Sequence, residues 1–523
     1  RRIRRAGDTQ MTDVAVQEKE LLLGDEAVAL GAIHAGISGA FAYPGTPSTE
    51  IFEFIERQKD PAIAARWSTN EKVAFEEALG MSYAGKRALV SMKHVGLNVA
   101  ADAFVNSGIT GVNGGLVLAV ADDPGMHSSQ NEQDSRYYAQ FAMVPCLEPS
   151  DQQQCYDLVR QAFDISERLG LPVVVRLVTR LAHSRAVVET KEPRGQNQLR
   201  PSESRSWILL PSNAREGYRR LIEKQADVLA ALAELGGCKR YGAENGPLGV
   251  IVSGIGWNYM REVLPDIEEL PPTLRVTGYP LAEAAVEELL DSCDEVLLLE
   301  EGNPFIEEKL RGFPVRGRKR VHGRLDGTVP RTGELTPDIV HAALTVRGLE
   351  VEAPTGPLAP RPPSLCSGCP HGDMFDALKK AMKPFADGRS FSDIGCYTLG
   401  ALPPYEAIHS CVDMGASISM AIGAARAGLH PAAAVIGDST FVHSGMTPLV
   451  DAALEDTPIT VIILDNSTVG MTGGQQTAAT GPAIPKLVEG LGVPKEHIRL
   501  VNPLPKEREA ISQILSEEFA HPG

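Results

Sequence analysis

The sequence predicts an α/β protein of three doubly wound domains, each built on a mainly parallel sheet. Two observations favour this class: short apolar runs alternate with amphipathic stretches along most of the chain, and turns rich in glycine and proline separate them. A length of 523 residues is enough for three or four domains of roughly 100–200 residues each. Hydrophobic residues make up 43% and charged residues 22% of the chain, which excludes a disordered protein.

The balance of charges excludes two classes of partner. Fifty basic against 67 acidic side chains give a net charge of −17, the wrong sign for wrapping nucleic acid or coating an anionic membrane. No apolar run reaches the roughly 18–20 residues of a membrane helix, and the basic start Arg1–Arg5 has no apolar segment behind it. Eight cysteines are too few for a disulfide framework. We therefore expect a soluble, cytoplasmic protein that acts on small molecules.

The first domain is predicted over residues 21–190. Its apolar strands and amphipathic helices alternate as in βαβ units, which join parallel strands. We expect strands at Ala40–Tyr43, Ala88–Met92, Leu116–Ala121 and Pro172–Val178, and helices near Thr49–Gln58 and Asn70–Ala84. A polar segment interrupted by prolines follows, so we interpret residues 191–245 as a linker.

The second domain is predicted over residues 246–352. Its first strand runs into the turn Gly254-x-Gly256, which lacks the third glycine and a clearly placed acidic residue of a dinucleotide site. A strand-to-helix turn is the better interpretation. The proline-rich run 353–363 predicts a stiff, extended spacer before the third domain, which is predicted over 364–505.

Polar side chains follow two strands predicted in the third domain, Ala432–Gly437 and Ile459–Leu464. Asp438 comes directly after the first strand, and Asn466 soon after the second. Parallel strands of a βαβ unit end at the same sheet edge, where open α/β sheets bind ligands. With a backbone carbonyl near Thr468, these side chains would leave half of a magnesium octahedron for a diphosphate and water. Alternatively, Asp438 is only a turn or cap residue and Asn466 a turn former.

The segment from Gly437 to Asn466 resembles the thiamine diphosphate motif, in which a Gly-Asp pair is followed by an asparagine after the next strand. Here the step from Asp438 to Asn466 is 28 residues. The resemblance implies bound thiamine diphosphate and Mg²⁺, with Asp438, Asn466 and Thr468 around the metal. The implied cofactor-binding residues are Gly395, Cys396, Tyr397, Gly437, Asp438, Ser439, Thr440, Asn466, Thr468 and Met471.

Glu71 is the candidate for acid–base chemistry. Thiamine chemistry requires a carboxylic acid beside the aminopyrimidine ring, and a buried glutamate suits this role because burial raises its pKa. However, Ser68-x-x-Glu71 is also a capping box, in which the glutamate only returns a hydrogen bond to the helix start. Catalysis is favoured by a wider match, because residues 21–190 resemble the pyrimidine-binding domain of 2-oxoacid:ferredoxin oxidoreductases, whose corresponding helix carries the catalytic glutamate.

Four further segments resemble the alpha subunits of indolepyruvate:ferredoxin oxidoreductases: Ala121–Asp134, Cys366–His371, Asp393–Gly400 and Met471–Gly473. The resemblance implies a pyrimidine-binding domain, a transketolase-C-like middle domain and a diphosphate-binding domain, in that order. It implies oxidative decarboxylation of an aryl 2-oxoacid, of the indolepyruvate or phenylpyruvate type, to an aryl-acetyl-CoA. Implied partners are coenzyme A, ferredoxin or another electron acceptor, and a smaller beta subunit in a dimer of alpha–beta pairs.

The resemblance also suggests substrate and cluster residues. Thr46 lies in a segment that resembles a substrate-binding loop, and Lys93 and His94 could hold the substrate carboxylate; alternatively, each is an exposed loop residue. Cys366, Cys369 and Cys396 resemble three ligands of a [4Fe–4S] cluster, since thiolates at such spacing bind iron–sulfur or zinc. Alternatively, they are small buried cysteines. Cys411 is the nearest candidate for a fourth ligand, but it follows in another predicted loop.

Two features leave the reaction open. This chain lacks the ferredoxin-like segment with which longer family members end, so electrons leave through another subunit, the remaining tail is absent from this sequence, or the reaction is not linked to ferredoxin. The segment 471–476 also departs from the histidine-bearing version of the family. Two alternatives are therefore kept: a non-oxidative thiamine-dependent 2-oxoacid decarboxylase or carboligase, and a scaffold subunit with a vestigial thiamine site.

Overall fold

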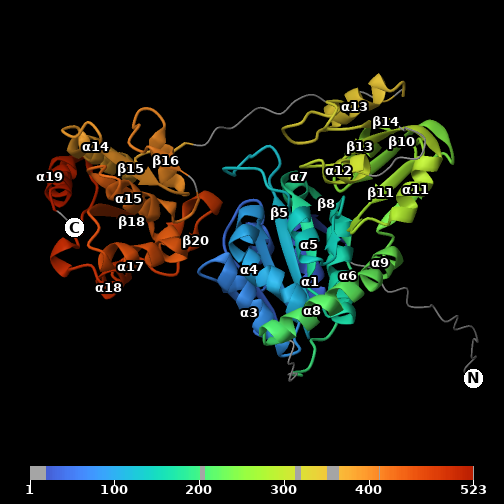
Figure 1. The fold of residues 1–523 in the computed structure, drawn as a ribbon, viewed down its shortest axis with the longest axis horizontal. Helices are drawn as coiled ribbons and strands as arrows, with labels where there is room; N and C mark the ends of the chain where they lie inside the picture. Colours follow the sequence, from blue (N-terminus) through green and yellow to red (C-terminus); the bar gives the residue numbers. More distant parts are fainter. Residues whose placement is uncertain are drawn as a thin grey trace, which may run out of the picture.

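The computed structural model describes residues 19–200, 207–312, 320–349, 351, 364–411 and 413–521. It contains three α/β domains (Figure 1), and each of the three larger sheets is mainly parallel, which confirms the predicted fold class. The predicted spacer 353–363 and the basic start Arg1–Arg5 lie outside the described residues. Within the described residues, no helix combines the length and the apolar character needed to cross a membrane.

The first domain is built on a seven-stranded sheet in the order β12-β6-β7-β5-β4-β2-β3, parallel except at the β12 edge. Its strands are β2 Gly39–Ala42, β3 Ala64–Trp67, β4 Ala88–Lys93, β5 Leu116–Asp122, β6 Cys146–Leu147, β7 Val173–Val178 and β12 Gly278–Tyr279. In β5, Val117 and Ala119 belong to one apolar core and Leu118 and Val120 to the other. Side chains alternate along a strand, so this division means that both faces of the sheet are covered.

Helices cover the two faces of this sheet in separate groups. The core that contains Val117 includes residues of α1 Gly24–His34, α2 Thr49–Gln58, α6 Gln152–Leu169 and α7 Thr179–His183. The opposite core includes residues of α3 Glu71–Tyr83, α4 His94–Thr110 and α5 Ser135–Ala142. An antiparallel pair, β1 Lys19–Leu23 and β8 Arg185–Glu189, joins the two ends of the domain.

The middle domain has a five-stranded sheet in the order β14-β13-β10-β11-β9, parallel except for β9. Its strands are β9 Cys238–Tyr241, β10 Gly246–Ser253, β11 Thr273–Val276, β13 Cys293–Leu299 and β14 Arg320–His322. Its helices are α10 Gly256–Val263, α11 Glu283–Asp291, α12 Phe305–Gly312 and α13 Pro337–Val346. The turn at Gly254 leads from β10 directly into α10, as the sequence predicted.

The segment 191–245, expected as a linker, contains regular structure. It includes α8 Pro211–Glu223, α9 Gln225–Glu234 and strand β9. Leu221, Val228 and Leu232 are buried in the apolar core of the first domain. Their helices therefore belong to the packing of that domain, because their spacing places one apolar stripe against it.

The third domain has a four-stranded parallel sheet in the order β16-β15-β17-β18. Its elements are α14 Pro370–Met382, β15 Arg389–Ser392, β16 Ser410–Cys411, α15 Ala416–Arg426, β17 Ala432–Gly437, α16 Asp438–Thr440, α17 Met446–Leu454, β18 Ile459–Leu464, β19 Thr468–Val469, β20 Gln475–Gln476, α18 Ala483–Gly490 and α19 Arg508–Phe519. The predicted domain ended at 505, but α19 buries Ile511, Leu515 and Phe519 in its core. In Figure 1 this domain, orange to red, lies beside the blue first domain.

Candidate active site between the first and third domains

Asp438 stands where the sheet of the third domain ends. Gly437, the last residue of β17, is paired in register with Leu464, the last residue of β18, so both strands end at the same edge. The Asp438 side chain is buried, and burial raises its pKa to about 7, with the nearby Asp465 carboxylate acting in the same direction. Its Oδ2 atom has no hydrogen-bond partner. A buried carboxylate oxygen without a partner is costly unless a cation or a proton satisfies it.

The loop after β18 lies against Asp438. Asp438 interacts with Asp465 and with the backbone of Ser467, the two residues that flank Asn466. The amide oxygen of Asn466 accepts a hydrogen bond from the Thr468 backbone nitrogen at 3.2 Å. The left-handed φ of 61° at Ser467 produces the reversal that brings Asn466 and Thr468 together. The structure thus gathers the three residues predicted around magnesium into one loop cluster.

A second loop packs beneath this edge. Tyr397 donates its hydroxyl hydrogen bond to Asp393, and a Cβ atom on Gly437 would lie 2.7 Å from the Tyr397 ring. Burial raises the pKa of Asp393 to about 6, although Ser417 donates to it at 2.5 Å. Thr440 Oγ1 also donates to the Ile394 carbonyl at 3.1 Å. A side chain at position 437 would therefore clash with the Tyr397 ring. The absence of a side chain at Gly437 also lets a ligand approach the backbone.

Glu71 begins helix α3 but does not cap it. The N-cap is Asn70, whose side chain accepts a hydrogen bond from the Val73 nitrogen at 2.9 Å, while Ser68 donates to Glu77. The capping-box interpretation of Glu71 is therefore wrong. Glu71 is 4% exposed. A Cβ atom on Gly96 of α4 would lie 2.6 Å from the Glu71 side chain, so the absence of a side chain at Gly96 makes room for it.

The Glu71 carboxylate reaches the third domain. Its Oε2 lies 2.8 Å from Nε2 of His443, in the single π turn Phe441–Gly445 that precedes α17. Asn70 Nδ2 also donates to the His443 carbonyl at 3.1 Å. The sequence analysis did not identify His443, because it stands five residues after Asp438 without any pattern of its own. Glu71 and Asp438 are thus brought to the same domain interface within one chain.

Tyr43 makes a second bridge across this interface. Its hydroxyl lies 2.7 Å from the Ser439 hydroxyl, and its ring centroid is 4.7 Å from that of His443. Burial raises the pKa of Tyr43 well above its ordinary value, and the charges of Glu71 and Asp438 act in the same direction. Gln475 of β20 donates to Glu53 of α2 at 2.6 Å and closes the interface on another side. Catalytic groups enclosed here would be screened from water.

The predicted substrate residues lie on one side of Glu71. Lys93 donates to the Ser128 carbonyl at 3.3 Å, and the Ser128 hydroxyl donates to the Thr46 carbonyl at 3.2 Å. Lys93 and His94 are both buried, so neither is the exposed loop residue of the alternative interpretation. Burial lowers the pKa of Lys93 to about 8, while Asp123 and Glu71 favour its charged form. His94 pairs with the Asn131 carbonyl at 3.1 Å.

The three cysteines singled out by spacing lie near one another. The Cys369 nitrogen donates to the Cys366 carbonyl, which forms a turn before α14. Burial raises the pKa of the Cys396 thiol to about 11, and the neighbouring thiols of Cys369 and Cys366 add to the effect. The Cys396 sulfur also lies 3.9 Å from Nδ2 of Asn466. Cys411 interacts instead with the Asp393 carbonyl. The group formed by Cys366, Cys369 and Cys396 therefore adjoins the loop of Asn466 without Cys411.

Gly395 and Met471, the remaining predicted cofactor residues, flank this region. Gly395 has an extended backbone, and a Cβ atom at this position would lie 2.2 Å from the Tyr397 ring. Met471 is half exposed in the 3-10 turn Gly470–Thr472, where a Cβ atom on Gly470 would lie 3.8 Å from both Asn466 Nδ2 and Cys396 Sγ. Both residues therefore border the loops that carry Asn466 and Cys396.

Comparison with known proteins divides the chain in the same way. Residues 30–207 match the family "Pyruvate flavodoxin/ferredoxin oxidoreductase, thiamine diP-bdg". Residues 393–520 match the family "Thiamine pyrophosphate enzyme, C-terminal TPP binding domain". The first match contains Glu71 and the second contains Asp438 and Asn466.

Full-length relatives agree with these matches. The indolepyruvate oxidoreductase subunit IorA of Methanothermobacter thermautotrophicus is 38% identical over 96% of this chain and 85% of the relative. The corresponding subunit of Archaeoglobus fulgidus is 37% identical over 93% of this chain and 82% of its own. A solved 2-oxoglutarate:ferredoxin oxidoreductase from Magnetococcus marinus has the same fold over 63% of this chain and 65% of that chain, with a TM-score of 0.52 and 16% identity.

Proposed function

The chain belongs to the IorA family of indolepyruvate oxidoreductase subunits, and from this membership we propose that it oxidatively decarboxylates an aryl 2-oxoacid and forms the aryl-acetyl-CoA. It is a thiamine diphosphate-dependent 2-oxoacid oxidoreductase. The proposal depends mainly on one observation: within a single chain, Glu71 of the first domain contacts His443 of the third domain, close to Asp438. The proposed substrate is of the indolepyruvate or phenylpyruvate type, as in the name of the relatives.

The residues at the interface fit the cofactor and its metal. Asp438 Oδ2 is buried without a hydrogen-bond partner, and the loop of Asn466 and Thr468 lies against it. We propose that these three residues hold Mg²⁺, which prefers oxygen ligands and keeps diphosphate oxygens and water. The further cofactor contacts proposed are Gly395, Cys396, Tyr397, Gly437, Ser439, Thr440 and Met471.

The proposed mechanism assigns this chain the tasks of positioning and proton handling. Bound thiamine diphosphate supplies the carbon nucleophile for the keto carbon and accepts the electron pair released with carbon dioxide. Glu71 holds and returns a proton at its carboxylate, in an interface that excludes water. Lys93, with Thr46 and His94, attracts the substrate carboxylate. Burial lowers the pKa of Lys93 to about 8, but Asp123 and Glu71 favour its charged form, and the attraction between the ammonium group and a carboxylate is stronger in buried surroundings than in water.

We propose that electrons leave through the three-cysteine group. Cys366, Cys369 and Cys396 would ligate an iron–sulfur cluster next to the cofactor, and their proximity to one another and to Asn466 supports this role. Ferredoxin or another protein would accept the electrons.

The proposed location is the cytoplasm. None of the eight cysteines is paired in a disulfide, which supports a reducing compartment.

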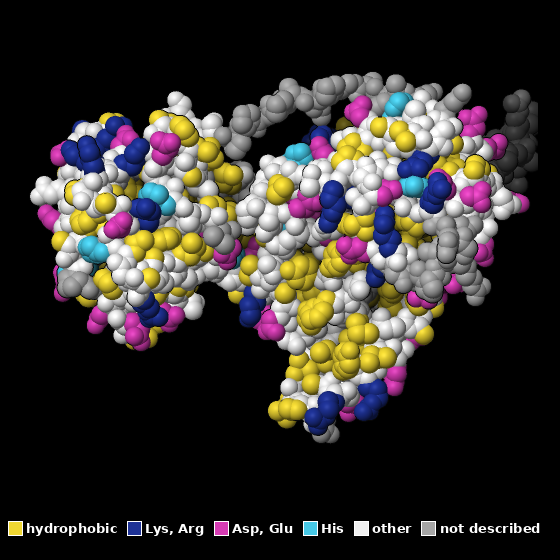
Figure 2. Space-filling model, turned by 45° about the horizontal axis from the view of Figure 1, so that its top comes forward, with side chains coloured by type: hydrophobic (Ala, Val, Ile, Leu, Met, Phe, Trp, Pro, Cys, Tyr) yellow, Lys and Arg dark blue, Asp and Glu magenta, His cyan; other side chains and the backbone are white. Residues whose placement is uncertain are grey.

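A smaller beta subunit is the proposed partner, in a dimer of alpha–beta pairs. Helices α4 and α8 pack side by side and expose the apolar residues Val99, Tyr218 and Ile222. Figure 2 shows hydrophobic side chains gathered in the lower part of the molecule. Exposed apolar side chains that cluster on one face are typical of a protein interface, and they support the heteromeric assembly.

The substitution Glu71→Gln tests the proposal. It keeps the shape of the side chain but removes the ionisable carboxyl, so we expect 2-oxoacid turnover to fall by at least about a hundredfold, as loss of a general acid–base group does. The enzyme would be purified without oxygen together with the beta subunit and assayed with a panel of 2-oxoacids, coenzyme A and ferredoxin.

Glu76→Gln is the matched control, because Glu76 lies on the same helix, is half exposed and forms a surface ion pair with Lys72. It should leave turnover unchanged. Full activity of Glu71→Gln would contradict the proposed role and favour a scaffold subunit. An aldehyde product without acyl-CoA would favour the non-oxidative decarboxylase or carboligase instead.

A further inference from the structure

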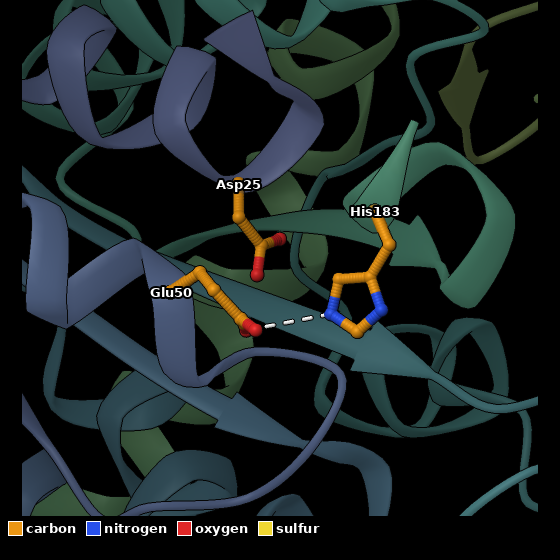
Figure 3. A group of neighbouring side chains, drawn as sticks. All are labelled: Asp25, Glu50 and His183. Carbon is orange, nitrogen blue, oxygen red and sulfur yellow. Dashed lines mark hydrogen bonds and ion pairs between the residues drawn. The ribbon is translucent and has the colours of Figure 1, made fainter. Parts of the chain in front are cut away.

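A second group of metal-ligating side chains lies in the first domain, apart from the candidate active site. It consists of Asp25 in the first turn of α1, Glu50 in the first turn of α2 and His183 at the end of α7. One ligand atom of each side chain lies within 4.8 Å of the corresponding atom of the other two. Figure 3 shows the three side chains converging from three separate helices, with Glu50 and His183 joined by a hydrogen bond.

Asp25 distinguishes this group from an ordinary acidic surface. Its side chain is 0% exposed, and neither carboxylate oxygen has a hydrogen-bond partner. In Figure 3 the Asp25 side chain extends toward Glu50 and His183, and one of its carboxylate oxygens points into the space between them. A buried carboxylate without a hydrogen-bond partner is satisfied by a proton or by a cation, and burial raises the pKa of Asp25 well above its ordinary value. A metal ion held together with Glu50 and His183 would satisfy it without a proton. Glu50 cannot supply the positive charge because it is also acidic.

From this geometry we propose that Asp25, Glu50 and His183 bind a divalent first-row transition metal ion such as Zn²⁺. Zinc binds nitrogen at 2.0–2.1 Å and carboxylate oxygen at 2.0–2.2 Å, so two tetrahedral ligands are about 3.4 Å apart. His183 Nε2 and Glu50 Oε2 are 3.4 Å apart. Two carboxylates and a neutral imidazole also balance a charge of +2. A mixed nitrogen and oxygen set with three protein ligands suits zinc, with water in the fourth position, better than magnesium or calcium.

The surroundings hold the ligands in place and leave a path for the ion. The Gly24 nitrogen donates to the Ser184 carbonyl at 3.2 Å, which ties the residue before Asp25 to the residue after His183. Gln152 also donates to the Ser184 carbonyl, at 2.8 Å. The side chains of Glu50 and His183 are about one-third exposed, so an ion can enter on their side and reach Asp25 at the closed end.

The proposed ion has a structural role. It would connect α1, α2 and α7 at one point, and α2 begins directly after the segment that contains Tyr43 and Thr46. Anything that binds the folded state but not the unfolded state raises stability. We therefore expect Zn²⁺ to raise the thermal unfolding temperature of the metal-free chain. This inference is independent of the thiamine reaction, since no residue of the group belongs to the candidate active site.

The test is a Zn²⁺ titration of the full chain after removal of metal with a chelator, by competition with a chromophoric zinc indicator. Wild type should bind one equivalent of Zn²⁺ more than His183→Ala. His183 is partly exposed, so His183→Ala should fold normally. Asp25→Asn should lose the same equivalent, or bind it at least about tenfold more weakly, because it lacks the carboxylate charge.

His497→Ala is the matched control, because His497 also pairs with a glutamate, Glu518, at 3.0 Å. The His521 ring lies beside His497, but among the described residues these side chains do not bring three ligand atoms within 4.8 Å of one another. His497→Ala should bind like wild type. Co²⁺ distinguishes this site from the cysteines, since thiolate ligands give strong charge-transfer absorption and nitrogen and oxygen ligands do not. Equal zinc stoichiometry and affinity in wild type and His183→Ala, or no zinc binding at all, would overturn the proposal.

Discussion

At the scale of single residues, the position of Glu71 depends on what its neighbours lack. Gly96 in α4 leaves the space that the Glu71 side chain occupies, and a Cβ atom there would lie 2.6 Å from both Cγ and Oε1. The Glu71 carboxylate can therefore reach His443 across the domain interface. A glycine inside a helix costs stability relative to alanine, so its presence in α4 is explained by this contact.

Gly96→Ala should accordingly reduce activity through Glu71. The added methyl group must displace the carboxylate from the position opposite His443, so we expect kcat to fall by at least about tenfold, which corresponds to a barrier increase of about 1.4 kcal/mol. Steady-state assays of the complex with a 2-oxoacid and coenzyme A measure this effect. Gly80→Ala in α3 is the control, since nothing lies within 4 Å of its Cβ position, and it should keep activity. Equal kcat in both variants would contradict the explanation.

At the scale of secondary-structure elements, the start of α3 serves two purposes. Asn70 caps the helix by accepting from the Val73 nitrogen, and the same side chain donates to the His443 carbonyl in the third domain. An asparagine can do both because its amide has an acceptor oxygen and a donor nitrogen. Asn70 therefore both caps the helix that carries Glu71 and holds the start of this helix against the third domain.

Two substitutions should separate these purposes. Asn70→Ala removes both bonds, and we expect it to lower the free energy of unfolding by about 0.5–2 kcal/mol, the usual cost of losing an N-cap. Asn70→Asp keeps the cap but replaces the donor to the His443 carbonyl with an acceptor. It should unfold near the wild-type urea concentration yet show a higher KM for thiamine diphosphate. If Asn70→Asp were as unstable as Asn70→Ala, the capping assignment would be incorrect.

At the scale of the whole molecule, a buried group of charges joins the first and middle domains. Arg176 of β7 contacts Asp122 and Glu148 of the first domain and the Glu301 backbone of the middle domain. Arg136 contacts Asp134 and Glu300 in the same way, at 2.5 and 3.0 Å. All of these side chains are buried. Because strand β12 also pairs with β6 at this junction, the two domains should unfold together.

Arg176→Met should be strongly destabilising, because it leaves Asp122 and Glu148 buried without their main cation. Removing one partner of a buried ion pair costs about 3–5 kcal/mol. Arg168→Met is the control: Arg168 pairs with Glu234 on the surface, where an ion pair is worth about 0–1 kcal/mol. Calorimetry of both variants compares these losses. A shift for Arg176→Met no larger than that for Arg168→Met would show that the charges do not hold the junction.

Several features were predictable because they depend on neighbours in the chain. Apolar runs and their turns placed Thr49–Gln58, Ala432–Gly437 and Ile459–Leu464 at the bounds that the structure has. Asp438 and Asn466 were placed near one sheet edge because consecutive parallel strands end there. The prediction did not include helices α8 and α9. They follow directly after a polar segment that contains prolines, and their apolar stripe is short.

The amino-acid sequence alone therefore determined the fold class, the strands of the third domain and the residue types for a diphosphate and a metal. Tertiary structure decided the rest: Glu71 faces His443, which is 372 residues away in the chain, and Lys93 is buried rather than exposed. Local patterns reflect the periodicity of one element, whereas these contacts form only when separate domains dock. Their partners are set by packing across the interface, which no short-range pattern records.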